Sequence, residues 1–302
     1  MKSTVLPCWL GHRAALLVLL FCALTSLGAA RRSSVLAAED AEIGEFVAFC
    51  DFSHRAPDDP IVIPGLPGGS HGHEFFGSVV TSAATQLDDL LNADTTCDPV
   101  GDRSAYWVPT LLDGDGTPVA FENGTFYYLV HVDNHADVQP YPLGLKVIAG
   151  NAAAARPGEA QHIKWSCLGS GVSSTSAIVQ CPADSRLELL INFPDCWDGV
   201  NLDSADHKSH MAYSAGGACP STHPVVVPAL QFKLRYATPG GEDFTLSSGP
   251  GYTAHGDFFN AWEPAALQNR LECLRTLTKC GPEGYPQEES LSESIFLPML
   301  TR

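Results

Sequence analysis

Short apolar runs separated by Gly, Pro, Asp and Asn dominate the chain between residues 46 and 281. Runs of this length, bounded by turn-forming residues, are typical of β-strands. Within Arg186–Phe193 apolar and polar side chains alternate for part of the length, as they do in a half-buried strand. The predicted strands are Ile61–Ile63, Ala105–Pro109, Phe126–Val132, Leu143–Ile148, Arg186–Phe193, Val225–Leu234 and Phe244–Leu246.

Two segments have helical spacing instead. Thr85–Leu91 is short, whereas Glu263–Thr278 carries Pro264 at an early helical position and leucines three or four residues apart. These elements predict a mainly β fold, a single sandwich or jelly-roll-like domain with long disulfide-braced loops and a C-terminal helix.

The ends of the chain differ from this pattern. Lys2 and Arg13 precede an apolar run of 11 residues that begins at Ala14, and small residues follow to Ala30. This is the pattern of a secretory signal, and the run is shorter than the roughly 20 residues that span a bilayer. We therefore expect a signal peptide at 1–30 (cleavage near Ala38 is the alternative), a flexible lead-in at 31–45, one secreted domain at 46–281 and an acidic tail at 282–302.

The charge balance narrows the classes of partner. The chain has 17 Lys and Arg against 34 Asp and Glu, which gives a formal net charge of −17. Such a surface repels phosphate backbones and anionic membranes. We therefore expect no nucleic-acid partner, and no segment after the signal is long and apolar enough to span a membrane.

Eight cysteines follow the predicted signal, at positions 50, 97, 167, 181, 196, 219, 273 and 280. An even number in an exported chain indicates four disulfides, of which sequential pairing is the simplest of 105 arrangements. The sequence has no Cys-x-x-Cys spacing, so the cysteines do not indicate a metal site. Asn123-Gly124-Thr125 is a glycosylation acceptor that suits an exposed loop.

Histidines supply the strongest functional signal, because they gather in short polar motifs. In an extended strand His71 and His73 point to one face. A second motif, between Asp198 and Tyr213, contains histidines and carboxylates, and further histidines follow at His223 and His255. The candidate catalytic residues are His71, His73, Asp203, Asp206, His207, His210, His223, His255 and Asp257.

Imidazole is the commonest metal ligand and an effective proton shuttle, so these residues could form a metal centre or an acid–base site. The predicted metal ligands are His71, His73, His207 and His210, with a divalent metal as the cofactor. The alternative is that each histidine only braces a loop through hydrogen bonds to the backbone. A His-Glu-x-x-His helix is missing from the sequence, and Ser214 lacks the parallel-sheet context of a nucleophile elbow.

Aromatic side chains occur in the same segments, and their rings could stack on sugars or fill the core. Trp107 and Trp197 lie beside predicted turns and are the best candidates for sugar binding, together with Tyr213.

Several joined motifs occur along the chain between about residues 46 and 281. They begin at Phe49-Cys50, Asp58-Asp59-Pro60, Pro64-Gly65, Tyr106-Trp107, Phe193-Pro194, Leu202-Asp203, Cys219-Pro220 and Leu246-Ser247. Together these motifs resemble the DUF1996 family, a domain of unknown function in secreted fungal and actinobacterial proteins, sometimes beside carbohydrate-binding WSC modules. The resemblance implies secretion and one domain, and supplies no reaction. Ser78 departs from the family pattern, which has Asn there.

Two functions remain open on this basis. The first is a secreted hydrolase or lyase that acts on cell-wall or other extracellular polysaccharide. The second is a non-catalytic, glycan-binding or wall-associated domain. A structural domain with protein partners is a third reading.

Overall fold

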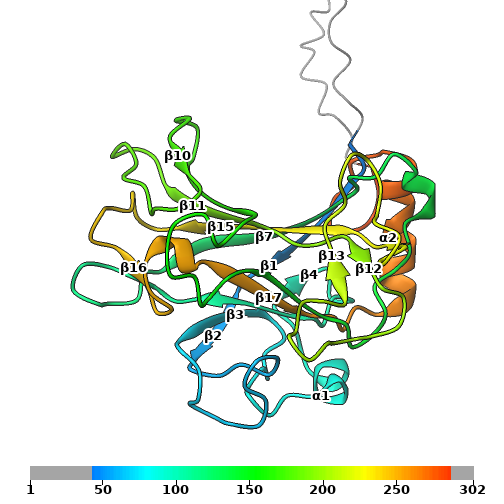
Figure 1. Ribbon diagram of the computed structural model, residues 1–302, viewed down its shortest axis with the longest axis horizontal. Helices are drawn as coiled ribbons and strands as arrows, with labels where there is room; N and C mark the ends of the chain where they lie inside the picture. Colours follow the sequence, from blue (N-terminus) through cyan, green and yellow to red (C-terminus); the bar gives the residue numbers. More distant parts are fainter. Residues whose placement is uncertain (1–42, 287–302) are drawn as a thin grey trace, which may run out of the picture. The chain divides into compact units, whose positions relative to one another are not determined.

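Two antiparallel sheets form the centre of the fold in the computed structural model, which describes residues 43–286 (Figure 1). The larger sheet has seven strands, in the order β10 (Ser173–Ser174), β9 (Ile163–Cys167), β11 (Leu187–Asn192), β15 (Ala229–Tyr236), β7 (Phe121–Leu129), β1 (Glu45–Cys50) and β4 (Cys97–Asp98). The smaller has five, in the order β2 (Phe52–Ala56), β3 (His73–Gly77), β5 (Ala105–Pro109), β17 (His255–Phe259) and β8 (Lys146–Gly150). The prediction of a mainly β fold is confirmed.

Shorter elements flank the sheets. Two small sheets consist of β12 (Cys196–Trp197), β13 (Met211–Ala212) and β14 (Val225–Val226), and of β6 (Leu111–Leu112) and β16 (Thr245–Leu246). The helices are α1 (Leu87–Asn92), α2 (Pro264–Arg275) and the 3₁₀ turns η1 (His135–Asp137) and η2 (Gly251–Thr253). Helix α2 begins at the proline that the sequence predicted near its start.

The sequence located some strands and missed others. Ala105–Pro109 coincides with β5, whereas Ile61–Ile63 forms turns rather than a strand. The cause is Asp59, whose carboxylate accepts hydrogen bonds from the N–H groups of Ile61 and Val62 and bends the chain there. Strands β3 and β17 were not predicted, because their His, Gly and charged residues weaken the apolar signal although every residue in them is buried.

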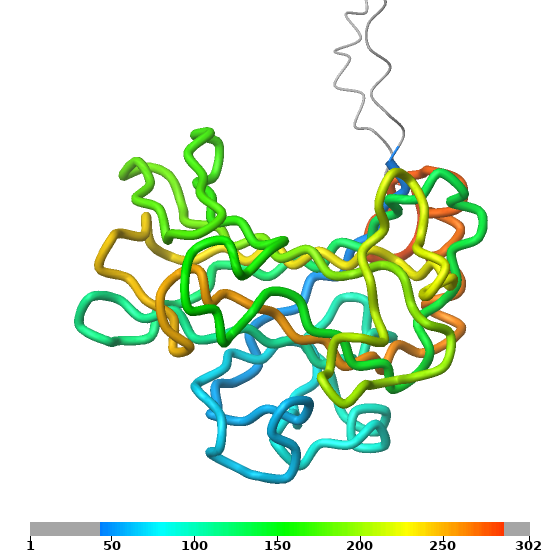
Figure 2. Tube along the Cα trace, viewed as in Figure 1, coloured from blue at the N-terminus to red at the C-terminus, as the bar shows by residue number. Residues whose placement is uncertain are grey.

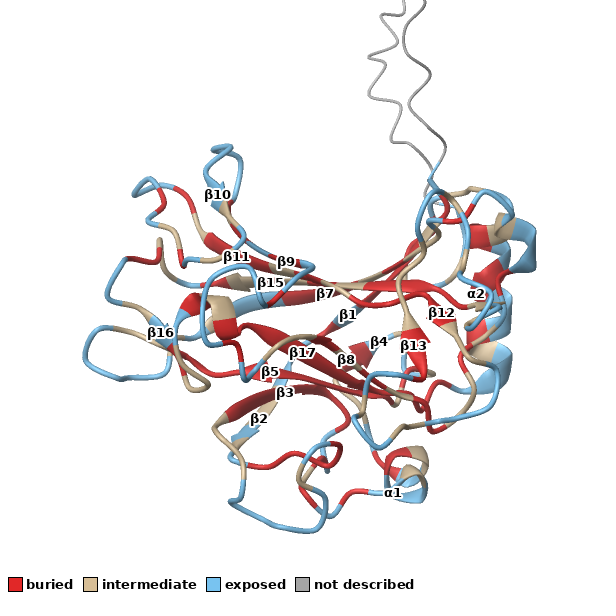
Figure 3. Ribbon diagram, viewed as in Figure 1, coloured by how far each residue is buried: buried red, intermediate tan, exposed pale blue. Residues whose placement is uncertain are grey.

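The main core lies between the two sheets (Figure 3). Tyr106 of the smaller sheet packs on Phe126 of the larger, with ring centroids 4.2 Å apart. Gly256 allows close approach, since a Cβ at this position would lie 3.0 Å from the ring of Phe193 and 3.1 Å from Phe232. Side chains from alternate positions of β17 therefore point into this core.

The opposite face of the smaller sheet carries a second apolar cluster. Phe75, Trp107 and Phe259 pack there against Ile61 and Leu90 of α1. The connections from β2 to β3 and from β3 to β5, the second of which includes α1, cover this face. The smaller sheet is therefore covered on both sides (Figure 2).

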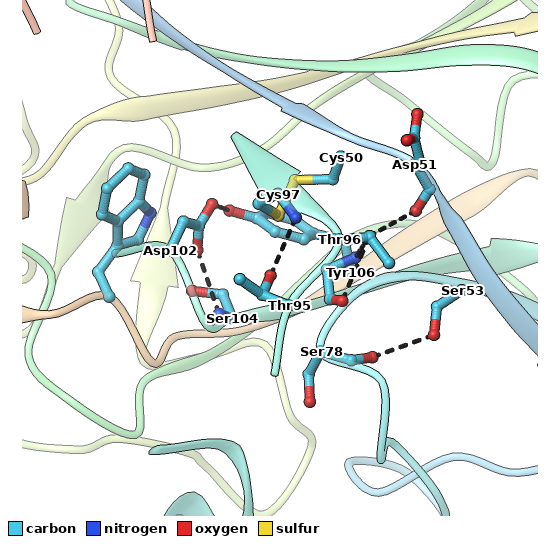
Figure 4. The surroundings of a disulfide bond; sticks show 12 residues. Cys50, Asp51, Ser53, Ser78, Thr95, Thr96, Cys97, Asp102, Ser104 and Tyr106 are labelled. Carbon is cyan, nitrogen blue, oxygen red and sulfur yellow. Dashed lines mark hydrogen bonds between the residues drawn. A yellow bond between two sulfur atoms is a disulfide. The ribbon is translucent and has the colours of Figure 1, made fainter. Parts of the chain in front are cut away.

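A chain of hydrogen bonds crosses the main core. The indole N–H of Trp262 donates to the hydroxyl of Tyr128, 2.8 Å away, and that hydroxyl bonds to Tyr106. The Tyr106 hydroxyl donates to the carboxylate of Asp102, which also accepts the backbone N–H of Ser104 (Figure 4). Because an indole can only donate, the hydroxyl protons all point toward Asp102.

Four disulfides join the cysteines in sequential pairs, as the simplest arrangement predicted: Cys50–Cys97, Cys167–Cys181, Cys196–Cys219 and Cys273–Cys280. The first lies beside Asp102 (Figure 4). Its sulfurs are bonded to each other and are therefore no metal ligands. Four disulfides fit an oxidising compartment.

Among residues 43–286, no helix is both long and apolar enough to cross a bilayer.

The predicted glycosylation acceptor is accessible to solvent. Asn123 is exposed, although it lies in strand β7 rather than in a loop.

Candidate metal centre

Three imidazoles meet at one end of the smaller sheet. Nε2 of His255 lies 3.2 Å from Nε2 of His71 and 3.3 Å from Nε2 of His73. One ring nitrogen of each of these three residues lies within 4.8 Å of the others. His73 and His255 are fully buried, and His71 is half-buried.

Strand pairing explains why residues so far apart in sequence meet. In β3 and β17 alternate side chains point to opposite faces. Phe75 and Asp257 are both paired with Trp107 of the intervening strand β5, so all three share one face. His73 and His255, two positions from Phe75 and Asp257, fall on this same face.

Hydrogen bonds determine which nitrogens carry protons. Nδ1 of His73 lies 2.9 Å from the carbonyl of Asp58, and Nδ1 of His255 lies 2.9 Å from the carbonyl of Thr253. Because a carbonyl only accepts, each Nδ1 is the donor, and in the neutral ring Nε2 then carries a lone pair. Burial lowers the pKa of His71 and His73 and lowers the pKa of His255 to about 3. All three rings are therefore neutral near pH 7.

The distances between these nitrogens match those around a metal ion. Zinc binds imidazole nitrogen at about 2.0–2.1 Å, and in a tetrahedral site two such ligands lie about 3.3–3.4 Å apart. The distances of Nε2 of His255 from Nε2 of His71 and of His73, 3.2 and 3.3 Å, agree with this geometry. Without a cation between them, the lone pairs of His73 and His255 face each other at a repulsive distance.

A cleft of about 290 Å³ opens beside the imidazoles. Oδ2 of Asp257 is buried there without a hydrogen-bond partner among the described residues, 3.9 Å from Nε2 of His255. Burial raises the pKa of Asp257 well above its usual value, and the nearby carboxylate of Asp59 acts in the same direction. Lys208 brings a positive charge, and its ammonium donates to the carbonyl of Gly150 at 2.6 Å.

The predicted residues of the second motif mostly brace a loop. Nδ1 of His207 donates to Asp203 at 2.9 Å, and Asp206 accepts hydrogen bonds from neighbouring residues of the loop. His210 is buried, with its ring nitrogens 2.9 Å from the Ser204 hydroxyl and 2.6 Å from the Lys146 carbonyl. Of this group, His207 and Asp206 line the cleft.

His223 also lies outside the imidazole cluster, with Nε2 3.0 Å from the carbonyl of Ser209. The four predicted metal ligands are thus divided. His71 and His73 meet His255, which replaces His207 and His210 in the cluster. The reason is that the ring nitrogens of His210 already have partners, whereas His255 shares a sheet face with His73.

The predicted sugar-binding aromatic residues differ in accessibility. Trp107, expected to offer a stacking face, is instead 0% exposed and part of the cluster beneath α1. Trp197 is half-buried and donates its indole N–H to the carbonyl of Asn201 at 2.6 Å. Tyr213 lines a second hollow beside the cleft.

Asp59 and Lys208 line the cleft and were not among the predicted site residues. Lys208 could have been recognised as a rare cation between His207 and His210 in an acidic chain. Asp59 gave no comparable signal, because an Asp before Pro is common in turns.

Comparison with known proteins identifies a family without an assigned reaction. The family model described as "Domain of unknown function (DUF1996)" matches residues 59–262, which is more than half of the chain and includes all three clustered histidines. Neither the curated proteins nor the solved structures gave a match. On the strength of the family match, the chain belongs to the DUF1996 family.

Proposed function

We propose that this protein is a secreted, metal-dependent hydrolase or lyase of extracellular polysaccharide, with a divalent ion of the zinc type held by His71, His73 and His255. The observation that carries the proposal is the convergence of three neutral imidazoles, with Nε2 atoms 3.2 and 3.3 Å apart. Three protein ligands leave a fourth position for water or substrate, as in catalytic zinc sites.

Each neighbouring group has a role in this chemistry. When bound, such an ion acts as a Lewis acid and lowers the pKa of its water to about 7. Asp257, whose Oδ2 has no partner among residues 43–286, is placed to hold and return a proton. The ammonium of Lys208 lines the same cleft and can stabilise negative charge that develops on the substrate.

The carbonyls of Asp58 and Thr253 orient two of the ligands. Each accepts the Nδ1 proton of its imidazole at 2.9 Å and so directs Nε2 toward the ion. Such outer contacts fix the tautomer and orientation of ligating histidines.

Two properties support an extracellular polymer as the substrate. Four disulfides favour an oxidising compartment. The cleft is open to solvent and combines carboxylates, imidazoles and an ammonium with the apolar side chains of Val62, Ile63 and Ile148. This mixture suits a sugar, which has both hydroxyl groups and an apolar ring face.

Metal binding tests the proposal directly. Protein stripped with EDTA is titrated with Zn²⁺ in a calorimeter, and Co²⁺ is added separately to record its visible absorption. We expect one site per chain, intense tetrahedral cobalt bands, and at least a 100-fold loss of zinc affinity in His71→Ala and His255→Gln. Turnover is then measured on a panel of wall polysaccharides by mass spectrometry of the products.

His223→Ala is the matched control, because this histidine lies outside the cluster. It should bind zinc like the wild type. Circular dichroism of each variant confirms that it is folded. Failure of the folded wild type to bind any divalent metal would refute the metal centre, and metal binding without product from any polysaccharide would refute the catalytic part.

A further inference from the structure

A second hollow of about 330 Å³ adjoins the metal cleft. Both are lined by Ile148, Asn151 and Lys208, so they share a wall and open side by side. A substrate longer than one chemical unit could therefore occupy both, passing the ammonium of Lys208.

The second hollow contains a stacked pair of rings. His162 lies on Tyr213 with ring centroids 3.5 Å apart and planes 9° from parallel. The hydroxyl of Tyr213 donates to the carbonyl of Asn192 at 2.9 Å, which anchors the pair, while His162 is exposed. Flat rings fixed at the wall of a polar hollow can stack on the face of a sugar.

Backbone strain is concentrated around these two hollows. Only three described residues other than glycine have positive φ angles, and two of them line the hollows: His162 at 62° in the second, and His207 at 58° in the metal cleft. Left-handed backbone is unfavourable for such residues and persists where the surroundings enforce it, often at ligand sites.

Polar groups complete the lining. The side-chain amide of Gln161 makes no hydrogen bond among the described residues. The carboxylate of Glu159 belongs to the same wall and is held by the N–H of Ala155 and the guanidinium of Arg156, each 2.8 Å away. Amides and carboxylates beside a stacking ring are the groups that bind sugar hydroxyls in a largely preformed pocket.

We propose that the second hollow is an oligosaccharide subsite, which binds sugar units adjacent to the unit held at the metal cleft. This inference rests on the proposed function for its biological meaning, but the subsite itself depends on His162, Tyr213 and Gln161 and on no metal ligand. It predicts that the protein binds glycan chains, and that affinity rises with chain length until both hollows are filled.

Calorimetric titration with defined sugars tests the subsite. The probes are hexasaccharides of β-1,3-glucan, β-1,4-glucan, β-1,4-xylan and chitin, each with its disaccharide. We expect at least one hexasaccharide to bind at least tenfold more tightly than its disaccharide. His162→Asn, which tolerates left-handed backbone but removes the ring, and Gln161→Ala should each weaken this binding at least fivefold.

The control is His135→Ala, which removes a half-buried histidine from η1, outside both hollows. It should bind the hexasaccharide like the wild type, and all three variants should keep wild-type zinc affinity. Binding of the hexasaccharide by EDTA-stripped protein would support the subsite even if the metal proposal failed. Absence of binding for every probe, or equal binding by His162→Asn and wild type, would overturn the inference.

Discussion

Replacement of Asp102 by Asn tests the buried hydrogen-bond chain of the main core. Asp102 is fully buried and accepts hydrogen bonds from Tyr106 and Ser104. Burial raises its pKa from 3.8 to about 6, and the hydrogen bond from Tyr106 only partly offsets this effect. The asparagine variant keeps the size of the side chain but cannot titrate.

The sign and size of the effect follow from proton linkage. Between pH 4 and pH 6 the folded protein binds a proton at Asp102 that the unfolded chain has released, so stability falls as pH rises through this range. Raising the pKa from 3.8 to about 6 lowers the free energy of unfolding by about 3 kcal/mol over the whole titration of Asp102. Because the unfolded-state carboxyl is already partly ionised at pH 4, the free energy of unfolding of the wild type relative to Asp102→Asn should fall by about 2.5 kcal/mol between pH 4 and pH 7.

The assay is guanidinium unfolding of metal-free protein with intact disulfides, at half-unit steps from pH 4 to pH 7.5. Titration of all other groups cancels in the difference between the two proteins. Asp94→Asn, which removes an exposed carboxylate, is the control and should follow the wild type closely. A difference that stays constant with pH, or that rises, would show that burial does not determine the protonation of Asp102.

Two further predictions concern the strand that carries the site and the disulfides. Gly256→Ala should lower the free energy of unfolding by about 1–3 kcal/mol, because the added methyl group overpacks the core. It should also weaken zinc binding at least fivefold because it displaces β17, and unchanged zinc affinity in a destabilised variant would contradict this coupling. Removal of Cys50–Cys97, which closes a separation of 47 residues, should cost about 4 kcal/mol, against about 2.5 kcal/mol for Cys273–Cys280 with a separation of 7. Denaturant unfolding of the paired Cys→Ala variants measures both losses, and the reverse order would argue against a chain-entropy origin.

Much of the fold could be predicted because strands of ordinary composition have a local signal. Ala105–Pro109 is apolar throughout and was located to the residue, and the helix at Glu263–Thr278 was recognised from Pro264 and its leucines. Strands β3 and β17 escaped because polar residues interrupt their apolar pattern, whereas β1 and β9 escaped although most of their residues are apolar or buried. Which strands pair is set by contacts distant in sequence, and the pattern of single segments does not contain this information.

The kinds of residue in the site could be predicted from the sequence, but not which histidines come together. His71 and His73 were identified as a pair on one face, because strand alternation is a local property. His255 completes the cluster because only β5 separates β17 from β3, and only the sheet order reveals this. The exclusion of His210 could not be predicted either, because it depends on the contacts of its ring nitrogens with Ser204 and Lys146, which the sequence pattern of the histidine itself does not contain.

Because both faces of the smaller sheet are covered, its strands cannot change in length without disturbing the core or the cleft. Deletion or insertion of one residue inside β17 would exchange its faces, and would move His255 and Asp257 into the core and Phe258 into the cleft. Changes in length are therefore tolerated only in the connecting segments, such as the one between β2 and β3 that forms part of the cleft rim. In this chain the rim can therefore change in length while the His-x-Asp spacing of β17 stays fixed.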